Sequence, residues 1–387
     1  MKIIWMNYWF LDYRIPVYKA LSQIEGVELV VIYNKENIPE RTQKKLQNIE
    51  GMKAIAMENE RKLILGNKNR SGDFANKYIS IPYQPGLYRE IAHNKPDVVI
   101  SEGFFRWSIY NLIYKIRTKT PFVMLYERTE HTERNVNTVT KFLRKFVLNF
   151  IDVICVNGKL TKQYIKSLGY SEEKITTKHM VADIHDISNR VRDVSMKKRE
   201  IIKKRVDASG LIFLFIGQLM PRKGLKELIN AWLNTVINNG LDATLLILGD
   251  GVKKNEYSKL AGNSESIKFL GKIDYDDIHE YLSISDVMIM PTLEDNWSLV
   301  VPESMAAKLP VATTIYNGCY PDLVKEQNGW VFDPLNKEEF EKVLLEIIEN
   351  EENLAKMGEA SWQIIKDHSP EEAAKSIYNS CNKAIES

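Results

Sequence analysis

The chain has 387 residues, of which 44% are hydrophobic and 27% charged, and its net charge is +2. At about 100–200 residues per domain this length predicts two domains, and the composition excludes disordered, collagen-like and coiled-coil chains. The small net charge hides an asymmetry, because residues 1–185 hold 29 basic and 19 acidic residues whereas residues 186–387 hold 24 and 32. This asymmetry favours an anionic surface or substrate near the first half, and a chance split of solvated charges is the alternative.

The three cysteines, Cys155, Cys319 and Cys381, have neither metal-ligand spacing nor the pattern of a disulfide framework, which is typical of a reducing compartment. The first residues, MKIIWMNYWFLDYRIP, are interrupted by polar side chains and do not resemble a signal peptide. The sequence has no run of 18 apolar residues that would predict a membrane span. We therefore expect a cytoplasmic protein.

Short apolar runs alternate with amphipathic stretches along the whole chain. In the first half, strands are predicted at Lys2–Met6, Val27–Tyr33, Val98–Ser101, Phe122–Tyr126 and Val153–Val156, and helices at Ile15–Gln23, Tyr110–Arg117 and Lys141–Phe150. In the second half, strands are predicted at Ile212–Ile216, Thr244–Leu248, Ile267–Phe269, Val287–Met290 and Val311–Thr314, and helices at Gly224–Ile237, Tyr275–Ile284, Pro302–Ala307 and Lys337–Gln363. This alternation indicates an α/β fold with doubly wound parallel sheets.

A charge-rich segment without a strand pattern, Arg190–Arg205, separates the two series. We therefore expect an N-terminal domain over residues 1–189, a linker over 190–205 and a C-terminal domain over 206–369. A C-terminal helix at about 370–387 is expected to pack back on the first domain. Two Rossmann-like domains would face a central cleft, with ligands at the carboxyl ends of their strands.

A glycine-bounded turn, GQLMPRKG, follows the strand Ile212–Ile216 and precedes a helix. Gly217 permits a tight exit from the strand, and Gly224 would let the backbone approach a ligand near the helix N-terminus. Arg222 and Lys223 are suited to a diphosphate, because charge-assisted donors bind phosphate oxygens strongly. Basic residues beside a helix start are usually only solvated, so this turn alone is a weak signal.

A stronger signal follows the strand Val287–Met290, in PTLEDNWSLVVPESMAA. Asp295 and Glu303 lie eight positions apart, with a tight polar loop and a helix start between them. Successive backbone N–H groups of such a loop can bind an anion, and the two carboxylates can accept hydrogen bonds from sugar or ribose hydroxyls. The alternative is that Glu303 is a first-turn carboxylate stabilised by the helix dipole and Asp295 an ordinary turn residue.

These motifs resemble the donor-binding domain of glycosyltransferase family 4, a family of retaining enzymes with the GT-B fold. The resemblance runs through residues 211–335, in FIGQLMPRKGLKELINAW, LLILGDG, IKFLGKI, LSISDVMIMPTLEDNWSLVVPESMAAKLPVATT and NGWVFDP. The first half resembles the family more weakly, in KPDVVISEG, FVMLYE and KITTKHMVADI. The resemblance implies a retaining, metal-independent glycosyltransferase of the hexosyltransferase type that needs no cofactor and uses a nucleotide-sugar, with a UDP-sugar expected in preference to a GDP-sugar.

The resemblance also implies roles for the acidic residues. Glu303 would hold the nucleotide ribose. Asp295, where the family usually has glutamate, would contact hydroxyls of the donor sugar and be essential for catalysis, and Glu294 is a candidate to share that role. The expected donor-binding set is completed by residues of the two loops: Gly217, Asn296, Trp297, Ser298, Leu299 and Val300.

The family's diphosphate-binding basic pair falls on Gln218 and Lys223. Because Gln218 is neutral where the family has arginine, Arg222 is a candidate substitute for the missing charge. In the first half, the family's histidine near the reaction centre falls on Glu127, so Glu127 or the nearby His131 is expected to contact donor or acceptor. A surface-loop role for both is the alternative.

Three further segments each allow a functional and a structural interpretation. The aromatic loop Asn7–Arg14 could stack on an acceptor sugar or pack under the first helix. The D-x-D pattern of Asp274-Tyr275-Asp276 resembles a metal-binding motif, but its place before a helix favours an N-cap, and no metal site is predicted. The segment Val136–Phe150, with Lys141, Arg144 and Lys145 among apolar residues, predicts a basic amphipathic helix suited to anionic lipid. A normal docking helix is the alternative.

The acceptor follows from the basic first half and the resemblance together. We expect a lipid-linked glycan at the inner face of the plasma membrane, in bacterial capsule or O-antigen biosynthesis, with peripheral contact to anionic membrane. A GT-B synthase acting on a small soluble sugar and a catalytically degenerate nucleotide-sugar-binding subunit are the alternatives. A nucleic-acid partner is not expected, because the chain lacks such a motif and a strongly basic balance.

Overall fold

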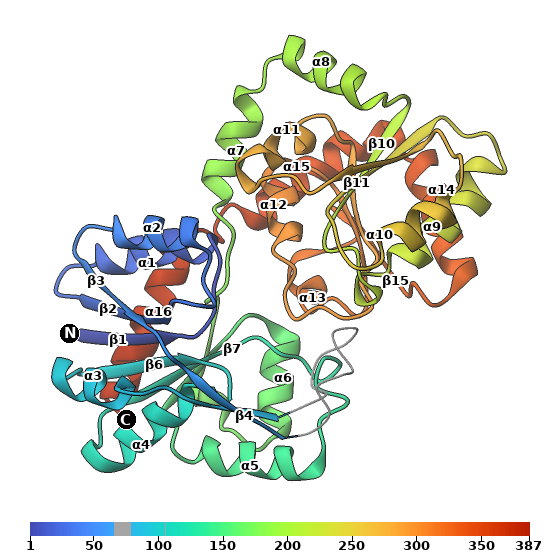
Figure 1. Ribbon diagram of the computed structural model, residues 1–387. Coiled ribbons are helices and arrows are strands. Elements are labelled where there is room, and N and C mark those ends of the chain that lie inside the picture. Colours follow the sequence, from blue (N-terminus) through green and yellow to red (C-terminus); the bar gives the residue numbers. More distant parts are fainter. Residues whose placement is uncertain (66–78, 105) are drawn as a thin grey trace. The chain divides into compact units, whose positions relative to one another are not determined.

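The computed structural model describes residues 1–65, 79–104 and 106–387. It separates into two compact units (Figure 1): unit 1 contains residues 1–182 and 368–387, and unit 2 contains residues 183–367. The expected linker at 190–205 needs correction, because these residues lie in helices α7 (Ile184–Asp193) and α8 (Met196–Val206) of unit 2. Apolar side chains of both helices, including Ile187, Val191 and Ile202, are buried. The chain therefore leaves unit 1 after residue 182, seven residues earlier than expected.

Unit 1 is built on a parallel sheet of seven strands in the order β3-β2-β1-β6-β7-β8-β9, accompanied by a two-stranded antiparallel sheet of β4 and β5. Its strands are β1 (Lys2–Asn7), β2 (Glu28–Asn34), β3 (Met52–Met57), β4 (Arg61–Leu65), β5 (Ile79–Tyr83), β6 (Val98–Glu102), β7 (Phe122–Tyr126), β8 (Val153–Val156) and β9 (Ile175–Thr177). Its helices are α1 (Arg14–Ser22), α2 (Glu40–Gln47), α3 (Leu87–Asn94), α4 (Ser108–Thr118), α5 (Thr138–Leu148), α6 (Lys159–Ser167), η1 (Glu172–Lys174) and α16 (Pro370–Ile385).

Unit 2 is built on a parallel sheet of six strands in the order β12-β11-β10-β13-β14-β15. Its strands are β10 (Leu211–Ile216), β11 (Ala243–Leu248), β12 (Ile267–Gly271), β13 (Val287–Met290), β14 (Val311–Thr314) and β15 (Gly329–Phe332). Besides α7 and α8, its helices are η2 (Pro221–Lys223), α9 (Leu225–Trp232), η3 (Leu233–Ile237), α10 (Lys254–Ala261), η4 (Tyr275–Asp277), α11 (Ile278–Leu282), α12 (Val300–Ala306), α13 (Tyr320–Leu323), α14 (Lys337–Glu349), η5 (Glu351–Asn353) and α15 (Leu354–Ile365).

Both sheets reverse their winding beside their first strand. In unit 1 the first strand, β1, lies between β2 and β6, and in unit 2 the first strand, β10, lies between β11 and β13. In open parallel sheets the crevice at this reversal, outside the carboxyl ends of the strands, is where ligands bind. The two reversals therefore mark where each unit should hold a ligand.

Buried apolar strands form the core of each unit, because both faces of a parallel sheet are covered by helices. The last helix, α16, belongs to the core of unit 1 although it follows unit 2 in sequence (Figure 1). Its Ala373, Ile377 and Cys381 are buried in a cluster with Val17 and Leu21 of α1. Among the described residues, no helix is long and apolar enough to cross a membrane.

Candidate functional site

The donor-binding residues predicted for unit 2 lie at the reversal of its sheet. The turn of Gly217–Lys223 follows β10, and the loop from Pro291 to Leu299 follows the neighbouring strand β13. Because the two strands are parallel neighbours, their carboxyl ends bring both loops to one edge. Two motifs more than 70 residues apart in sequence thus form one site.

A nearly buried ion pair joins the two motifs. Lys223 Nζ lies 2.5 Å from Asp295 Oδ2, and each of the two side chains is 12% exposed. A pair so shielded from water is electrostatically stronger than a surface pair. The predicted phosphate-binding lysine and the predicted sugar-binding aspartate therefore meet at one point of the site.

Backbone contacts hold the turn and the loop together. The carbonyl oxygen of Arg222 accepts hydrogen bonds from the backbone N–H groups of Leu293 and Glu294, at 2.8 and 3.2 Å, and from Thr292 Oγ1 at 3.0 Å. The Arg222 guanidinium donates back to the carbonyl oxygen of Glu294, at 3.3 Å. Arg222 thus braces the loop, and its predicted role as a substitute phosphate ligand stays a prediction.

Gly224 has a structural role within the fold. It has a φ of +68°, and a Cβ built on it would lie 1.8 Å from the carbonyl oxygen of Pro291. The glycine is required because the chain after β13 passes against it. The close approach seen in the structure is internal to the fold, and an approach to a ligand stays a prediction.

Glu303 lies on α12 and is buried, and burial raises the pKa of its carboxyl to about 7. Tyr275 of η4 donates a hydrogen bond to this carboxylate, which opposes the increase in pKa. Burial, followed by the charge of Glu303, raises the pKa of the Tyr275 phenol. A buried carboxylate that accepts a hydroxyl hydrogen bond has the chemistry expected for binding a ribose hydroxyl.

The remaining predicted donor residues differ in exposure. Gln218 is exposed and Gly217 is half-buried, whereas Glu294, Trp297 and Ser298 are buried. Because these three side chains are buried, we expect this part of the loop to contact a ligand mainly through backbone groups. The half-buried members of the loop are Asn296, Leu299 and Val300.

The N-cap interpretation of the D-x-D segment holds only in part. Asp274 occupies the N-cap position of η4, but its side chain makes no capping hydrogen bond. Asp276 instead lies near Arg190 of α7, with an Oδ1–Nη1 distance of 3.8 Å. Tyr275 between them reaches Glu303, so the segment contributes to the site through its aromatic residue.

Glu127 and His131 belong to unit 1, in the loop that follows β7. Both are half-buried. The carbonyl oxygen of Glu127 accepts a hydrogen bond from Thr161 Oγ1 at 3.0 Å. The charge of the Glu127 carboxylate contributes to raising the pKa values of Arg14 and Glu102. His131 lies further along the loop, where its carbonyl oxygen accepts a hydrogen bond from the backbone N–H of Arg134 at 3.3 Å. The structure thus places Glu127 near a polar cluster that the sequence motifs did not reveal.

That cluster consists of Asn7, Arg14, Tyr18, Glu102 and His179. Arg14 Nη2 lies 2.9 Å from Glu102 Oε1, and Asn7 Nδ2 donates to the same oxygen at 2.7 Å and to the Tyr18 hydroxyl at 2.9 Å. One sequence feature could have predicted this cluster: Asn7 and Glu102 are polar residues at the ends of buried strands. In the aromatic loop beside them, Phe10 packs beneath α1 against Tyr18, whereas Trp9 is 46% exposed.

Residues 196–363 match a family model described as "Glycosyl transferases group 1". The GDP-mannose-dependent monoacylated alpha-(1-6)-phosphatidylinositol monomannoside mannosyltransferase of Corynebacterium glutamicum is 30% identical over 166 residues, which cover 38% of this chain and 43% of that protein. The UDP-Gal:alpha-D-GlcNAc-diphosphoundecaprenol alpha-1,3-galactosyltransferase of Escherichia coli is 24% identical over 277 residues, which cover 68% and 69%. The chain spans about half the length of the first curated relatives that it matches, between 43% and 57%.

Among solved structures, Anabaena HepE in complex with UDP has a TM-score of 0.75 at 14% identity, covering 98% of this chain and 99% of that one. Together with the two Rossmann-like parallel sheets, this similarity confirms the expected GT-B fold.

Proposed function

We propose that the protein is a retaining glycosyltransferase, because residues 196–363 match the model of the group 1 glycosyl transferases. It would move a sugar from a nucleotide-sugar donor to a hydroxyl group of a glycan acceptor. The observation that carries the proposal is the pairing of Lys223 with Asp295, together with the buried Glu303 on α12, the helix that begins where the Asp295 loop ends. These three side chains supply a cation for the diphosphate and acceptors for sugar and ribose hydroxyls.

The proposed reaction needs no dedicated base. As the bond between the anomeric carbon and the diphosphate oxygen breaks, the acceptor oxygen forms a bond to that carbon from the same face, so the configuration is retained. The acceptor proton passes to the leaving phosphate oxygen. Lys223 stabilises the charge that develops on the diphosphate, and fixed cations of this kind are usually the largest contribution to catalysis.

The donor is proposed to be a UDP-sugar. The Escherichia coli relative is named for a UDP-Gal donor and Anabaena HepE was solved with UDP, whereas the Corynebacterium glutamicum relative is named for GDP-mannose. Neither a metal nor another cofactor is part of the proposal.

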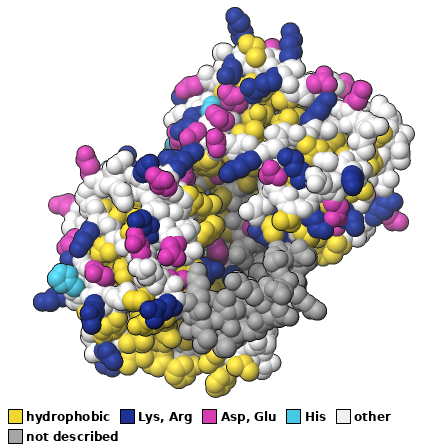
Figure 2. Space-filling model, viewed as in Figure 1, with side chains coloured by type: hydrophobic (Ala, Val, Ile, Leu, Met, Phe, Trp, Pro, Cys, Tyr) yellow, Lys and Arg dark blue, Asp and Glu magenta, His cyan; other side chains and the backbone are white. Residues whose placement is uncertain are grey.

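The acceptor is proposed to be a lipid-linked glycan of bacterial surface polysaccharide synthesis, reached from the inner face of the plasma membrane. Unit 1 exposes apolar side chains on helices α4 and α5, which are visible as a continuous hydrophobic surface in Figure 2. This α4–α5 apolar patch consists of Ile109, Ile113, Ile116, Val139, Phe142, Leu143 and Phe146. Large exposed apolar patches mark sites of interaction, and the names of both curated relatives contain a lipid acceptor.

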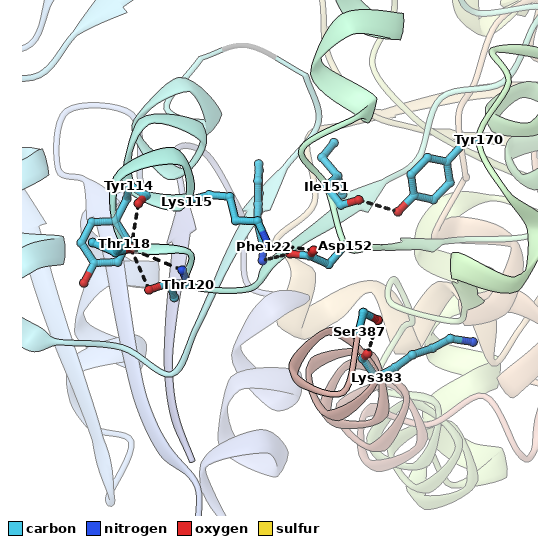
Figure 3. Close-up of polar contacts among 10 residues, drawn as sticks. All are labelled: Tyr114, Lys115, Thr118, Thr120, Phe122, Ile151, Asp152, Tyr170, Lys383 and Ser387. Atoms are coloured by element: carbon cyan, nitrogen blue, oxygen red, sulfur yellow. Dashed lines mark hydrogen bonds and ion pairs between the residues drawn. The ribbon is translucent and has the colours of Figure 1, made fainter.

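The basic residues near the patch differ in their availability to lipid. Arg144 is buried and pairs with Glu133, and Lys115 pairs with Asp152 at 2.5 Å, a contact drawn in Figure 3. The prediction that Arg144 faces lipid is therefore corrected. The basic side chains that remain exposed around the patch are Arg117, Lys119, Lys141 and Lys145.

The proposed function is tested by a thermal-shift screen of UDP-glucose, UDP-galactose, UDP-N-acetylglucosamine, GDP-mannose and ADP-glucose. A donor at 100 times its dissociation constant adds about 2.7 kcal/mol to the free energy of unfolding. The stabilising donor, radiolabelled in its sugar, is then incubated with polyprenyl-diphosphate-linked N-acetylglucosamine or with free sugars. We expect label in the lipid product. Label only in free sugars would indicate a soluble-acceptor synthase, and stabilisation without any turnover would indicate a binding subunit.

A further inference from the structure

The reversal in the sheet of unit 1 lies between β1 and β6, and both strands end there in polar side chains. Asn7 is the last residue of β1 and Glu102 is the last residue of β6. In unit 2 the corresponding edge carries the loops of the donor site. The same rule for parallel sheets therefore marks the Asn7–Glu102 edge as a binding edge.

Glu102 is held by one of its two carboxylate oxygens. Asn7 and Arg14 both reach Oε1, at 2.7 and 2.9 Å. Both of these contacts within the described part of the chain use Oε1, and the Glu102 side chain is 23% exposed. Oε2 can therefore accept hydrogen bonds from outside the protein.

Arg14 is fixed on its other side by a neutral histidine. Burial, followed by the positive charge of Arg14, lowers the pKa of His179 to about 3. His179 Nε2 lies 3.1 Å from the carbonyl oxygen of Tyr126, and Nδ1 lies 3.4 Å from Arg14 Nη2. Since a carbonyl only accepts and a guanidinium only donates, the proton is on Nε2. The cluster thus presents Glu102 in one fixed geometry.

Two further features of this edge favour a polar ligand. Burial raises the pKa of Glu102, and the charge of Glu127 raises it further, so the ionised form gains from additional donors. Asn157 follows β8 on the same edge and is buried, and its Oδ1 has no hydrogen-bond partner among the described residues. Buried acceptors without donors are costly in a folded protein. A ligand with several hydroxyl groups would satisfy such acceptors.

We propose that Glu102 is a sugar-binding residue of unit 1, whose Oε2 accepts hydrogen bonds from hydroxyl groups of a glycan lying across the carboxyl ends of β1, β6, β7 and β8. At about 4.8 Å between neighbouring strands this edge is about 14 Å long, so the ligand extends beyond a single small ion. The exposed ring of Trp9, two residues beyond Asn7, offers an apolar face to the sugar. Under the function proposed above, on which this identification rests, the glycan is the acceptor.

The test uses saturation-transfer NMR on the full chain with methyl glycosides of glucose, galactose and N-acetylglucosamine, in the presence of UDP. We expect at least one glycoside to bind the unaltered protein and Glu102→Gln to weaken its binding at least tenfold. Glu102→Asp keeps the charge that balances Arg14 but withdraws the carboxylate by one methylene, and it should weaken binding as well. Glu172→Gln alters an exposed carboxylate of unit 1 that pairs with Lys162 and Lys166 and should leave binding unchanged.

The thermal shift with UDP-glucose is measured on every variant, because the loops proposed to bind the donor lie in unit 2 and Glu102 lies in unit 1. Loss of glycoside binding in the Glu102 variants supports the inference whether or not UDP-glucose stabilises the protein, so the two proposals can fail separately. Glycoside binding within twofold of the unaltered protein in both Glu102 variants would overturn the inference. So would the absence of a signal from every glycoside.

Discussion

Lys223 and Asp295 are the residues on which the proposed chemistry of unit 2 depends most. We expect Lys223→Met to lower kcat/KM for the donor by about 10²–10³-fold, the usual effect of removing one preorganised charge-stabilising group. The measurement is a steady-state transfer assay with the donor identified by thermal shift. Lys226→Met is the matched control, because Lys226 is exposed three residues further along the chain. A loss smaller than tenfold in Lys223→Met would remove the lysine from the mechanism.

The raised pKa of Glu303, about 7, predicts how donor binding varies with pH. An ionised carboxylate accepts hydrogen bonds more strongly than a neutral one, so the donor should bind the ionised form. The dissociation constant of UDP should fall about tenfold per pH unit from pH 5 to pH 6 and level off above about pH 7.

Isothermal titration calorimetry between pH 5 and pH 8 checks this prediction, with Glu303→Gln expected to flatten the dependence. Glu227→Gln is the control, since burial also raises the pKa of Glu227 on α9. An unchanged pH profile in Glu303→Gln would contradict the ribose assignment. For the free protein the sign is opposite: the contribution of Glu303 to stability is complete below its usual pKa of 4.5 and is lost as the pH rises through 7.

At this scale the sequence predicted residues that lie within one motif, and it missed their distant partners. Asp295 and Glu303 are recognisable because their spacing and the intervening loop are local. The contact of Glu303 with Tyr275 depends on how η4 packs near α12. The contact of Arg14 with Glu102 joins the first residue of α1 to the last residue of β6. Neither contact is encoded in a local sequence pattern, so both became visible only in the folded structure.

Among the elements, α5 has two faces with different functions. Phe142 and Phe146 are exposed, whereas Arg144 is buried and pairs with Glu133 of the loop after β7. We expect the double variant Phe142→Ser/Phe146→Ser to bind vesicles of phosphatidylglycerol and phosphatidylcholine at least tenfold more weakly in a sedimentation assay, with its melting temperature unchanged. Vesicle binding equal to that of the unaltered protein would contradict membrane contact through α5.

A substitution on the opposite, buried face of α5 should lower the free energy of unfolding instead. Arg144→Met leaves the Glu133 carboxylate buried without one of its cations, and breaking a buried pair costs about 3–5 kcal/mol. Arg128 also pairs with Glu133, at 2.8 Å, and should reduce this cost. Urea unfolding measures the change, and Lys145→Met, on the exposed face, is the control. Equal stability of the two variants would place Arg144 outside the core.

The elements that could be predicted are those with long apolar or amphipathic patterns. All ten predicted strands are present, because buried parallel strands are continuous apolar runs. Five strands in the described part of the chain were not predicted. The strands β3, β9 and β15 lie at sheet edges and are short or only partly buried, and β4 and β5 form the separate two-stranded sheet. The helix predicted over 337–363 is divided by η5 into α14 and α15. The division coincides with the polar run of residues 349–353, ENEEN, which interrupts the apolar pattern.

In the whole molecule, the charge asymmetry follows the observed units. Unit 1 holds 31 basic and 21 acidic residues, and unit 2 holds 22 and 30. The difference therefore distinguishes two folded bodies and is not an effect of where the sequence was divided. The proposed binding of unit 1 to anionic vesicles should accordingly weaken as salt rises, because the Debye length falls to about 8 Å at 0.15 M.

The contribution of α16 to unit 1 predicts that changes at the end of the chain affect the first domain. Ile377 is fully buried in the α1–α16 core. Ile377→Ala should therefore destabilise unit 1 by about 2–5 kcal/mol, the usual cost of such a truncation. Calorimetry with and without UDP-glucose distinguishes the units, because the loops proposed to bind the donor belong to unit 2. Ile385→Ala is the control, since Ile385 is 46% exposed. A change confined to the transition that UDP-glucose raises would contradict this assignment.

Because α16 is synthesised after unit 2 but packs on unit 1, unit 1 cannot complete its core until the end of translation. When residue 182 has been made, the sheet of unit 1 still lacks the helix that covers Val17 and Leu21, and 185 residues of unit 2 must be translated first. At roughly 5–20 residues per second this takes about 10–40 s. During that interval the nascent first domain exposes an apolar face on the ribosome. Chaperone demand should therefore be set by the time needed to synthesise the second domain, and slower codons within it would prolong the exposure of the first.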